Sequence, residues 1–69
     1  MNNALFDLAG RVSVVSGAAQ GMGRATALAL AEAGSDLVLV DRNSEGMEET
    51  AGSIEKTGRR VLSVSIDVS

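Results

Sequence analysis

The chain has 69 residues, a formal net charge of −3 and 45% hydrophobic residues, and it lacks cysteine, histidine, proline, tryptophan and tyrosine. Without cysteine and histidine, neither disulfide bridges nor a Cys/His zinc site can stabilise the fold. The acidic balance argues against a nucleic-acid partner, which requires a basic surface, and no run of about 20 apolar residues is present that could span a membrane.

The first half of the chain predicts a lead-in segment, a strand and a helix. Met1–Ala9 is expected to dock its apolar side chains on a neighbouring surface. The β-branched run Arg11–Ser16 predicts a buried strand. Met22–Ala33 is rich in alanine and leucine and predicts a helix, which Gly34 ends in a left-handed conformation. Three alanines of this helix are expected to let it pack closely on the strands, namely Ala25, Ala27 and Ala29.

Two further strands are predicted in the second half. Leu37–Val40 is a continuous apolar run flanked by aspartates, a pattern typical of a parallel strand that is buried on both faces. Val61–Asp67 alternates apolar residues with Ser63 and Ser65, which favours an edge strand with one wetter face.

A second helix is expected between these two strands. Asn43 or Ser44 can cap its start, and Gly58 ends it. Its apolar residues recur at helical spacing, at Met47, Ala51 and Ile54. Glycines inside a helix each cost up to about 1 kcal/mol relative to alanine, so Gly46 and Gly52 should make this helix the weaker of the two.

The alternation of strands and helices predicts an α/β fold with a parallel sheet and right-handed crossovers. The expected strand order in space is third, second, first, which is half of a doubly wound Rossmann fold. A chain this short buries only about 60% of its unfolded surface. We therefore expect residues 1–69 to be either a piece of something larger, namely a partial dinucleotide-binding domain that is truncated after the third strand, or a chain that completes itself by association. No secretory signal is evident, so a cytoplasmic location is expected.

A glycine-rich turn joins the first strand to the first helix. It reads Ser16-Gly17-Ala18-Ala19-Gln20-Gly21-Met22-Gly23, with glycines spaced G-x-x-x-G-x-G. In this context the pyrophosphate of a dinucleotide lies on backbone N–H groups at the positive end of the helix dipole. Gly17 should allow a sharp turn, while Gly21 and Gly23 should remove Cβ atoms where backbone approaches phosphate or sheet.

An acidic residue, Asp41, ends the second strand eighteen residues beyond Gly23. A carboxylate at this place accepts hydrogen bonds from the adenosine ribose hydroxyls and repels a 2′-phosphate, so NAD is favoured over NADP. Arg24 and Arg42 keep NADP as the alternative, because either guanidinium could approach a 2′-phosphate. For Arg42, a solvated residue that stacks on the adenine is an equally good interpretation.

The third strand ends in Asp67, followed by Val68. The carboxyl ends of the strands line the ligand crevice of such a sheet, so Asp67 could bind the adenine amino group while Val68 packs on the ring. A strand-terminating aspartate that caps the next turn is the competing interpretation. The glutamates of the second helix are expected to be a solvated face and not a metal site.

Together these segments resemble the N-terminal part of a short-chain dehydrogenase/reductase, over nearly all 69 residues. The family's loop is usually written T-G-x-x-x-G-[I/L]-G, from which this chain departs mildly at Ser16 and Met22. The resemblance implies an NAD(P)-dependent oxidoreductase that moves hydride between nicotinamide and an alcohol or carbonyl substrate, in a parent protein that forms a homo-oligomer. The cofactor-binding positions that it implies are Gly17, Gln20, Gly21, Met22, Gly23, Asp41, Arg42, Asp67 and Val68.

The family's catalytic tyrosine and lysine lie beyond the third strand, and this chain has no tyrosine. We therefore expect no catalytic residue among these 69 and no turnover by them alone. Alternative functions are an NADPH-dependent 3-oxoacyl reductase of fatty-acid synthesis and a stand-alone nucleotide-binding module. A truncated product that aggregates through its open sheet edge is a further alternative.

Overall fold

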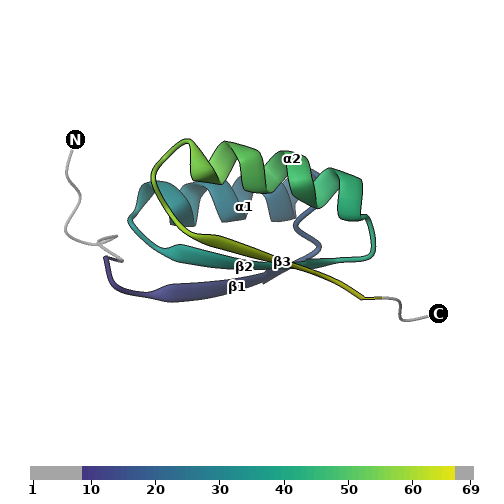
Figure 1. Ribbon diagram of the computed structural model, residues 1–69, viewed down its shortest axis with the longest axis horizontal. Coiled ribbons are helices and arrows are strands. Elements are labelled where there is room, and N and C mark those ends of the chain that lie inside the picture. Colours follow the sequence, from purple (N-terminus) through teal and green to yellow (C-terminus); the bar gives the residue numbers. More distant parts are fainter. Residues whose placement is uncertain (1–8, 67–69) are drawn as a thin grey trace.

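Apolar runs and helix-forming stretches alternate along the chain and produce a two-layer α/β structure. The computed structural model describes residues 9–66, so most of the predicted lead-in segment, and also Asp67 and Val68, lie outside the described residues. The strands form one parallel sheet in the order β1-β2-β3, which confirms the predicted order, and both helices cover the same face of it (Figure 1). The elements are β1 (Val12–Ser16), α1 (Gly21–Glu32), β2 (Asp36–Asp41), α2 (Ser44–Glu55) and β3 (Val61–Ser65).

The core lies between the sheet and the two helices. Val15 of β1 pairs with Leu39 of β2, and both side chains are buried on the helix-facing side, with exposed fractions of 6% and 0%. Ala27 and Ala31 of α1, four residues apart on one helix face, are buried against them. The expectation for Ala25 and Ala29 was wrong, because both are exposed.

The other face of the sheet carries apolar side chains without a helix over them in the described part of the chain. Val12, Val14 and Leu62 are 65%, 68% and 60% exposed. In β3, Ser63 pairs with Leu39 and therefore shares the helix-facing side, because side chains alternate between the faces of a strand. Leu62 and Val64 of β3 thus point to the uncovered face, whereas Val61 pairs with Leu37 and packs on the core. No helix among residues 9–66 is long and apolar enough to cross a membrane.

The helix ends follow the predicted signals. Gly34 follows α1 with φ of +108°, a left-handed conformation that glycine adopts without a Cβ clash. Of the two candidate caps for α2, Asn43 takes the role: its Oδ1 accepts a hydrogen bond from the Gly46 N–H at 3.0 Å. Gly58, with φ of +88°, lies just beyond the end of α2.

The two glycines inside α2 differ in their surroundings. A Cβ built on Gly46 would lie 2.8 Å from the Ala19 Cβ and 3.0 Å from the Ala19 carbonyl oxygen. A Cβ built on Gly52 would meet nothing within 4 Å. Gly46 is therefore required by the close approach of α2 to the glycine-rich turn, in addition to its intrinsic cost as a glycine inside a helix.

These surroundings predict opposite effects for the same substitution on one helix. Gly52→Ala should stabilise the protein by roughly 0.5–1 kcal/mol, because alanine loses less backbone entropy in a helix. Gly46→Ala should destabilise it by about 1–3 kcal/mol, because the added methyl group overpacks the contact with Ala19. Equilibrium urea unfolding of both variants measures the difference, and a stabilising Gly46→Ala would refute the packing argument.

Candidate functional site

The glycine-rich turn between β1 and α1 lies at the carboxyl end of the sheet. Gly17 has φ of +68°, and its N–H donates to the Val40 carbonyl of β2 at 2.8 Å, so the predicted sharp turn is present. Gly21 has φ of +60°, but a Cβ there would meet nothing within 4 Å. Glycine is needed at position 21 for its left-handed backbone and not, within this chain, for a close approach to the sheet.

The third glycine of the turn makes the closest approach. A Cβ on Gly23 would lie 1.9 Å from the Gly17 carbonyl oxygen and 2.6 Å from its carbonyl carbon. Both are backbone atoms, so no side-chain movement could relieve the overlap. The first turn of α1 therefore packs directly on the backbone that leaves β1.

The start of α1 has the properties of an anion-binding site. Its N-cap residue Gln20 has an extended backbone and makes no side-chain capping hydrogen bond, and no acidic residue lies in the first turn. In α2, by contrast, Asn43 caps the start and Glu45 lies in the first turn. The first N–H groups of a helix need acceptors and carry the positive end of its dipole. The start of α1 therefore fits a diphosphate, with Met22 beside it at 85% exposure.

Asp41 lies across the turn, at the end of β2. Its Oδ2 accepts a hydrogen bond from the Ala19 N–H, and its Oδ1 accepts one from the Asn43 N–H, each at 3.0 Å. The Asn43 N–H lowers the pKa of Asp41 below its ordinary value, and the Ala19 N–H adds to this effect. Asp41 is thus an ionised acceptor that also ties the glycine-rich turn to the start of α2.

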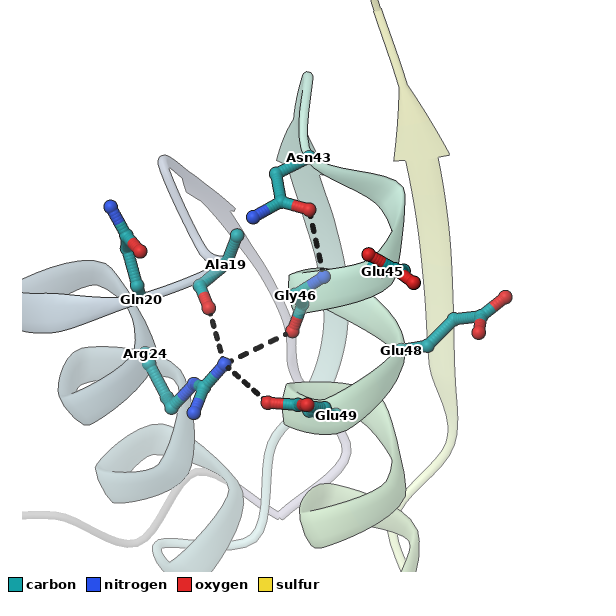
Figure 2. A pocket seen from close by; sticks show the side chains of 8 residues that line it. All are labelled: Ala19, Gln20, Arg24, Asn43, Glu45, Gly46, Glu48 and Glu49. Atoms are coloured by element: carbon teal, nitrogen blue, oxygen red, sulfur yellow. Dashed lines mark hydrogen bonds and ion pairs between the residues drawn. The ribbon is translucent and has the colours of Figure 1, made fainter.

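The two arginines that left NADP as the alternative cofactor, Arg24 and Arg42, have different environments. Arg24 turns toward α2, where its guanidinium contacts the carbonyl oxygens of Ala19 and Gly46 and the carboxylate of Glu49 (Figure 2). Its Nε and Nη2 groups are therefore engaged within the protein. Arg42 is exposed next to Asp41.

A cleft of about 530 Å³ opens between the turn and α2. Three glutamates are among its lining residues; Glu49 points toward Arg24, whereas Glu45 and Glu48 point away from it (Figure 2). Within residues 9–66, no group of three or more histidine, cysteine or acidic side chains is placed to hold a metal ion.

The structure also brings in a residue that the sequence patterns did not single out. Thr50 is fully buried, and its Oγ1 donates to the Ala18 carbonyl oxygen at 2.9 Å and accepts from Arg24 Nε at 2.9 Å. Thr50 follows Gly46 by four residues, which puts both on one face of α2. The only signal for this contact in the sequence was the spacing of four between a small and a polar residue, beside the apolar residues of α2.

Comparison with known proteins identifies relatives that match nearly the whole chain. A family model described as short chain dehydrogenase matches residues 11–69. The short chain dehydrogenase/reductase astE of Aspergillus oryzae is 44% identical over 69 residues, which cover 99% of this chain and 26% of that protein. The 7beta-hydroxysteroid dehydrogenase of Clostridium sardiniense is 41% identical over 61 residues, 87% of this chain and 23% of that protein. The chain thus spans about a quarter of the length of these relatives.

Two solved structures share the same arrangement. Carveol dehydrogenase from Mycobacterium avium, in complex with NAD, superposes with a TM-score of 0.84 at 32% identity over 90% of this chain and 27% of that one. A short chain dehydrogenase from Mycobacterium paratuberculosis bound to NAD gives a TM-score of 0.84 at 31% identity, over 88% of this chain and 27% of that one.

The approach of Gly23 to Gly17 predicts that Gly23→Ala deforms the turn. We expect a loss of about 3 kcal/mol in the free energy of unfolding, at the upper end of the usual overpacking cost, because the colliding atoms are backbone. Gly21→Ala should cost about 1–2 kcal/mol through its left-handed backbone alone. Urea unfolding of both variants checks this order, which a Gly23→Ala variant of unchanged stability would contradict.

The lowered pKa of Asp41 predicts a pH-dependent contribution to stability. A depressed pKa in the folded state means that the stabilisation is present above the unfolded-state pKa of about 3.9 and is lost as the pH falls through the folded-state value. Asp41→Asn should therefore be less stable than wild type at pH 7, and the gap should shrink in acid below about pH 4. Urea midpoints at neutral and acidic pH test this, with Glu48→Gln as a control for charge removal. A gap that widens in acid would argue against the ionised acceptor.

Proposed function

Because the chain belongs to the short-chain dehydrogenase family, we propose that residues 1–69 form the amino-terminal, cofactor-binding part of an NAD-dependent oxidoreductase that interconverts an alcohol and a carbonyl group. One observation carries this proposal. The uncapped start of α1 faces the glycine-rich turn, and the Asp41 carboxylate lies on the other side of that turn. An anion site and an acceptor of hydroxyl groups thus lie side by side, as a dinucleotide requires.

Each half of this arrangement has a proposed role. The backbone of the turn and the start of α1 would bind the diphosphate and its riboses, through Gly17, Gln20, Gly21, Met22 and Gly23. Each carboxylate oxygen of Asp41 accepts one backbone N–H and has further acceptor capacity for the adenosine ribose hydroxyls. Arg42 would stack on the adenine, and Asp67 and Val68, outside the described residues, would contact its ring.

The charges around the turn support NAD over NADP. Asp41 is ionised at neutral pH, and Glu45, Glu48 and Glu49 line the neighbouring cleft. A 2′-phosphate on the ribose would have to approach the Asp41 carboxylate, and like charges repel each other. The NAD-bound relatives from Mycobacterium are in line with this preference.

The uncovered face of the sheet supports a longer parent protein. Parallel sheets occur almost only where both faces are covered, yet Val12, Val14 and Leu62 are exposed here. We propose that further residues of the parent cover this face and supply the substrate site. NAD, when bound, would take up the hydride, while the proton that leaves with it needs a group that we place outside these residues.

The reading frame beyond Ser69 provides the direct test. We expect a Tyr-x-x-x-Lys segment, and we expect the complete protein to reduce NAD with an alcohol from a panel of small and steroid alcohols. NADH absorbance measures the reaction, and the tyrosine→Phe variant of that segment is the control. Turnover by residues 1–69 alone, or no NAD binding by the complete protein, would overturn the proposal.

Cofactor preference gives a sharper prediction at Asp41. Asp41→Ser in the complete protein removes the charge that repels a 2′-phosphate and leaves Arg42 to attract it. We expect the ratio of kcat/KM for NAD to that for NADP to fall by at least about tenfold. The double variant Asp41→Ser with Arg42→Ala is the control, and it should lose the gain in kcat/KM for NADP that Asp41→Ser produces. An unchanged ratio in Asp41→Ser would mean that the Asp41 carboxylate does not determine the preference between NAD and NADP.

A further inference from the structure

Two successive carbonyl groups of the glycine-rich turn are held by side chains from the helices. Thr50 of α2 donates from its hydroxyl to the Ala18 carbonyl oxygen at 2.9 Å. Arg24 of α1 donates from Nη2 to the Ala19 carbonyl oxygen (Figure 2). The turn is thus fixed from the side opposite to Asp41, by residues that do not belong to it.

The two side chains also bind each other. Arg24 Nε donates to Thr50 Oγ1 at 2.9 Å, and Arg24 Nη2 reaches the Gly46 carbonyl oxygen at 3.2 Å. Thr50 is 0% exposed, so water cannot replace the hydrogen bonds of its hydroxyl. Removal of that hydroxyl would leave buried polar groups without partners, which is costly. Arg24 and Thr50 therefore act as one unit, here called the Arg24–Thr50 pair.

Peptide geometry turns this contact into an orientation of the turn. The C=O and N–H groups of a trans peptide point in opposite directions. In the peptide between Ala18 and Ala19, Thr50 binds the C=O while Asp41 Oδ2 binds the N–H at 3.0 Å. In the next peptide, Arg24 binds the Ala19 C=O, which directs the N–H of Gln20 to the opposite side. Both peptide planes are fixed by groups outside the turn.

We propose that Arg24 and Thr50 are positioning residues that hold the glycine-rich turn in its diphosphate-binding conformation, and in register with Asp41, before the cofactor binds. This inference rests on the proposed function, because it assigns the diphosphate to the turn. Glycines at positions 17, 21 and 23 make the free turn conformationally permissive, and ordering it during binding would weaken affinity. The pair completes this ordering in the folded protein.

The exposed ion pair of Arg24 is not part of the proposed function of the pair. Glu49 Oε1 lies 3.3 Å from Arg24 Nη2, but the Glu49 side chain is 74% exposed. Such surface pairs contribute little, whereas hydrogen bonds to buried partners have no competing water. The buried hydroxyl of Thr50 is therefore the feature to remove in a test.

The test compares three variants of the complete protein. Thr50→Val keeps the side-chain shape but removes the hydroxyl, whereas Thr50→Ser keeps the hydroxyl. Thr57→Val is the control: it removes a hydroxyl that donates to the Ile54 carbonyl oxygen, at the end of α2 away from the turn. We expect Thr50→Val to raise the Kd and KM for NAD by about tenfold, the equivalent of one hydrogen bond. The kcat at saturating NAD should stay within about twofold, and Thr50→Ser and Thr57→Val should bind as wild type does.

Hydrogen exchange in the protein without cofactor separates positioning from a general loss of stability. In Thr50→Val, amides 17–21 should exchange about tenfold faster, while the amides of β2 keep their protection. Arg24→Lys, which cannot supply both donors, gives the same readout if Thr50→Val does not fold. Wild-type affinity in Thr50→Val, or equal losses in Thr50→Val and Thr50→Ser, would overturn the inference. Absence of NAD binding in the wild type would instead overturn the proposed function.

Discussion

The contact between the backbones of Gly17 and Gly23 determines the rest of the site. With no Cβ at position 23, the first turn of α1 packs on the Gly17 carbonyl, where a methyl group would lie only 1.9 Å from the oxygen. The chain between them must then turn tightly, which buries Ala18 and Ala19. Ala19 in turn needs space in the neighbouring helix, and Gly46 provides it. Gly23 and Gly46, which are far apart in the sequence and have no side chains, thus bring β1, α1 and α2 together.

This packing also separates two kinds of polar group at the same end of the sheet. The start of α1 presents N–H donors without an acidic residue in its first turn, whereas Asp41 presents acceptors. A ligand that carries both an anion and vicinal hydroxyl groups satisfies both, and neither a simple phosphate nor a simple sugar does. The ionised state of Asp41 is maintained by backbone N–H groups of the protein itself, so it does not depend on a ligand.

The sequence predicted the elements, their order and the position of the turn, because these depend on local periodicity and on glycine spacing. The errors concern contacts between distant segments. For Arg24 the sequence did not reveal the contacts with α2 residues more than twenty positions away. For Thr50 the only local signal was its spacing of four residues from Gly46, and a threonine in a helix is usually a surface residue. The expectation for Ala25 and Ala29 was wrong because each lies two residues from Ala27, which is roughly 200° around an α-helix and therefore on the opposite face from Ala27 and Ala31.

The uncovered face of the sheet links stability to the site. Val12 and Val14 lie on β1, an edge strand whose carboxyl end leads into Gly17. A layer that covered them would gain about 25 cal/mol for each Å² of apolar surface removed from water. The same layer would restrain β1 and with it the start of the turn. The helix-facing side of β1 is already fixed through Val15 in the core. Asp41 of β2 and the Arg24–Thr50 pair of α1 and α2 hold the turn. The diphosphate end of the site is therefore organised by contacts within residues 9–66, while the edge strand that leads into it gains further support from whatever packs on Val12 and Val14.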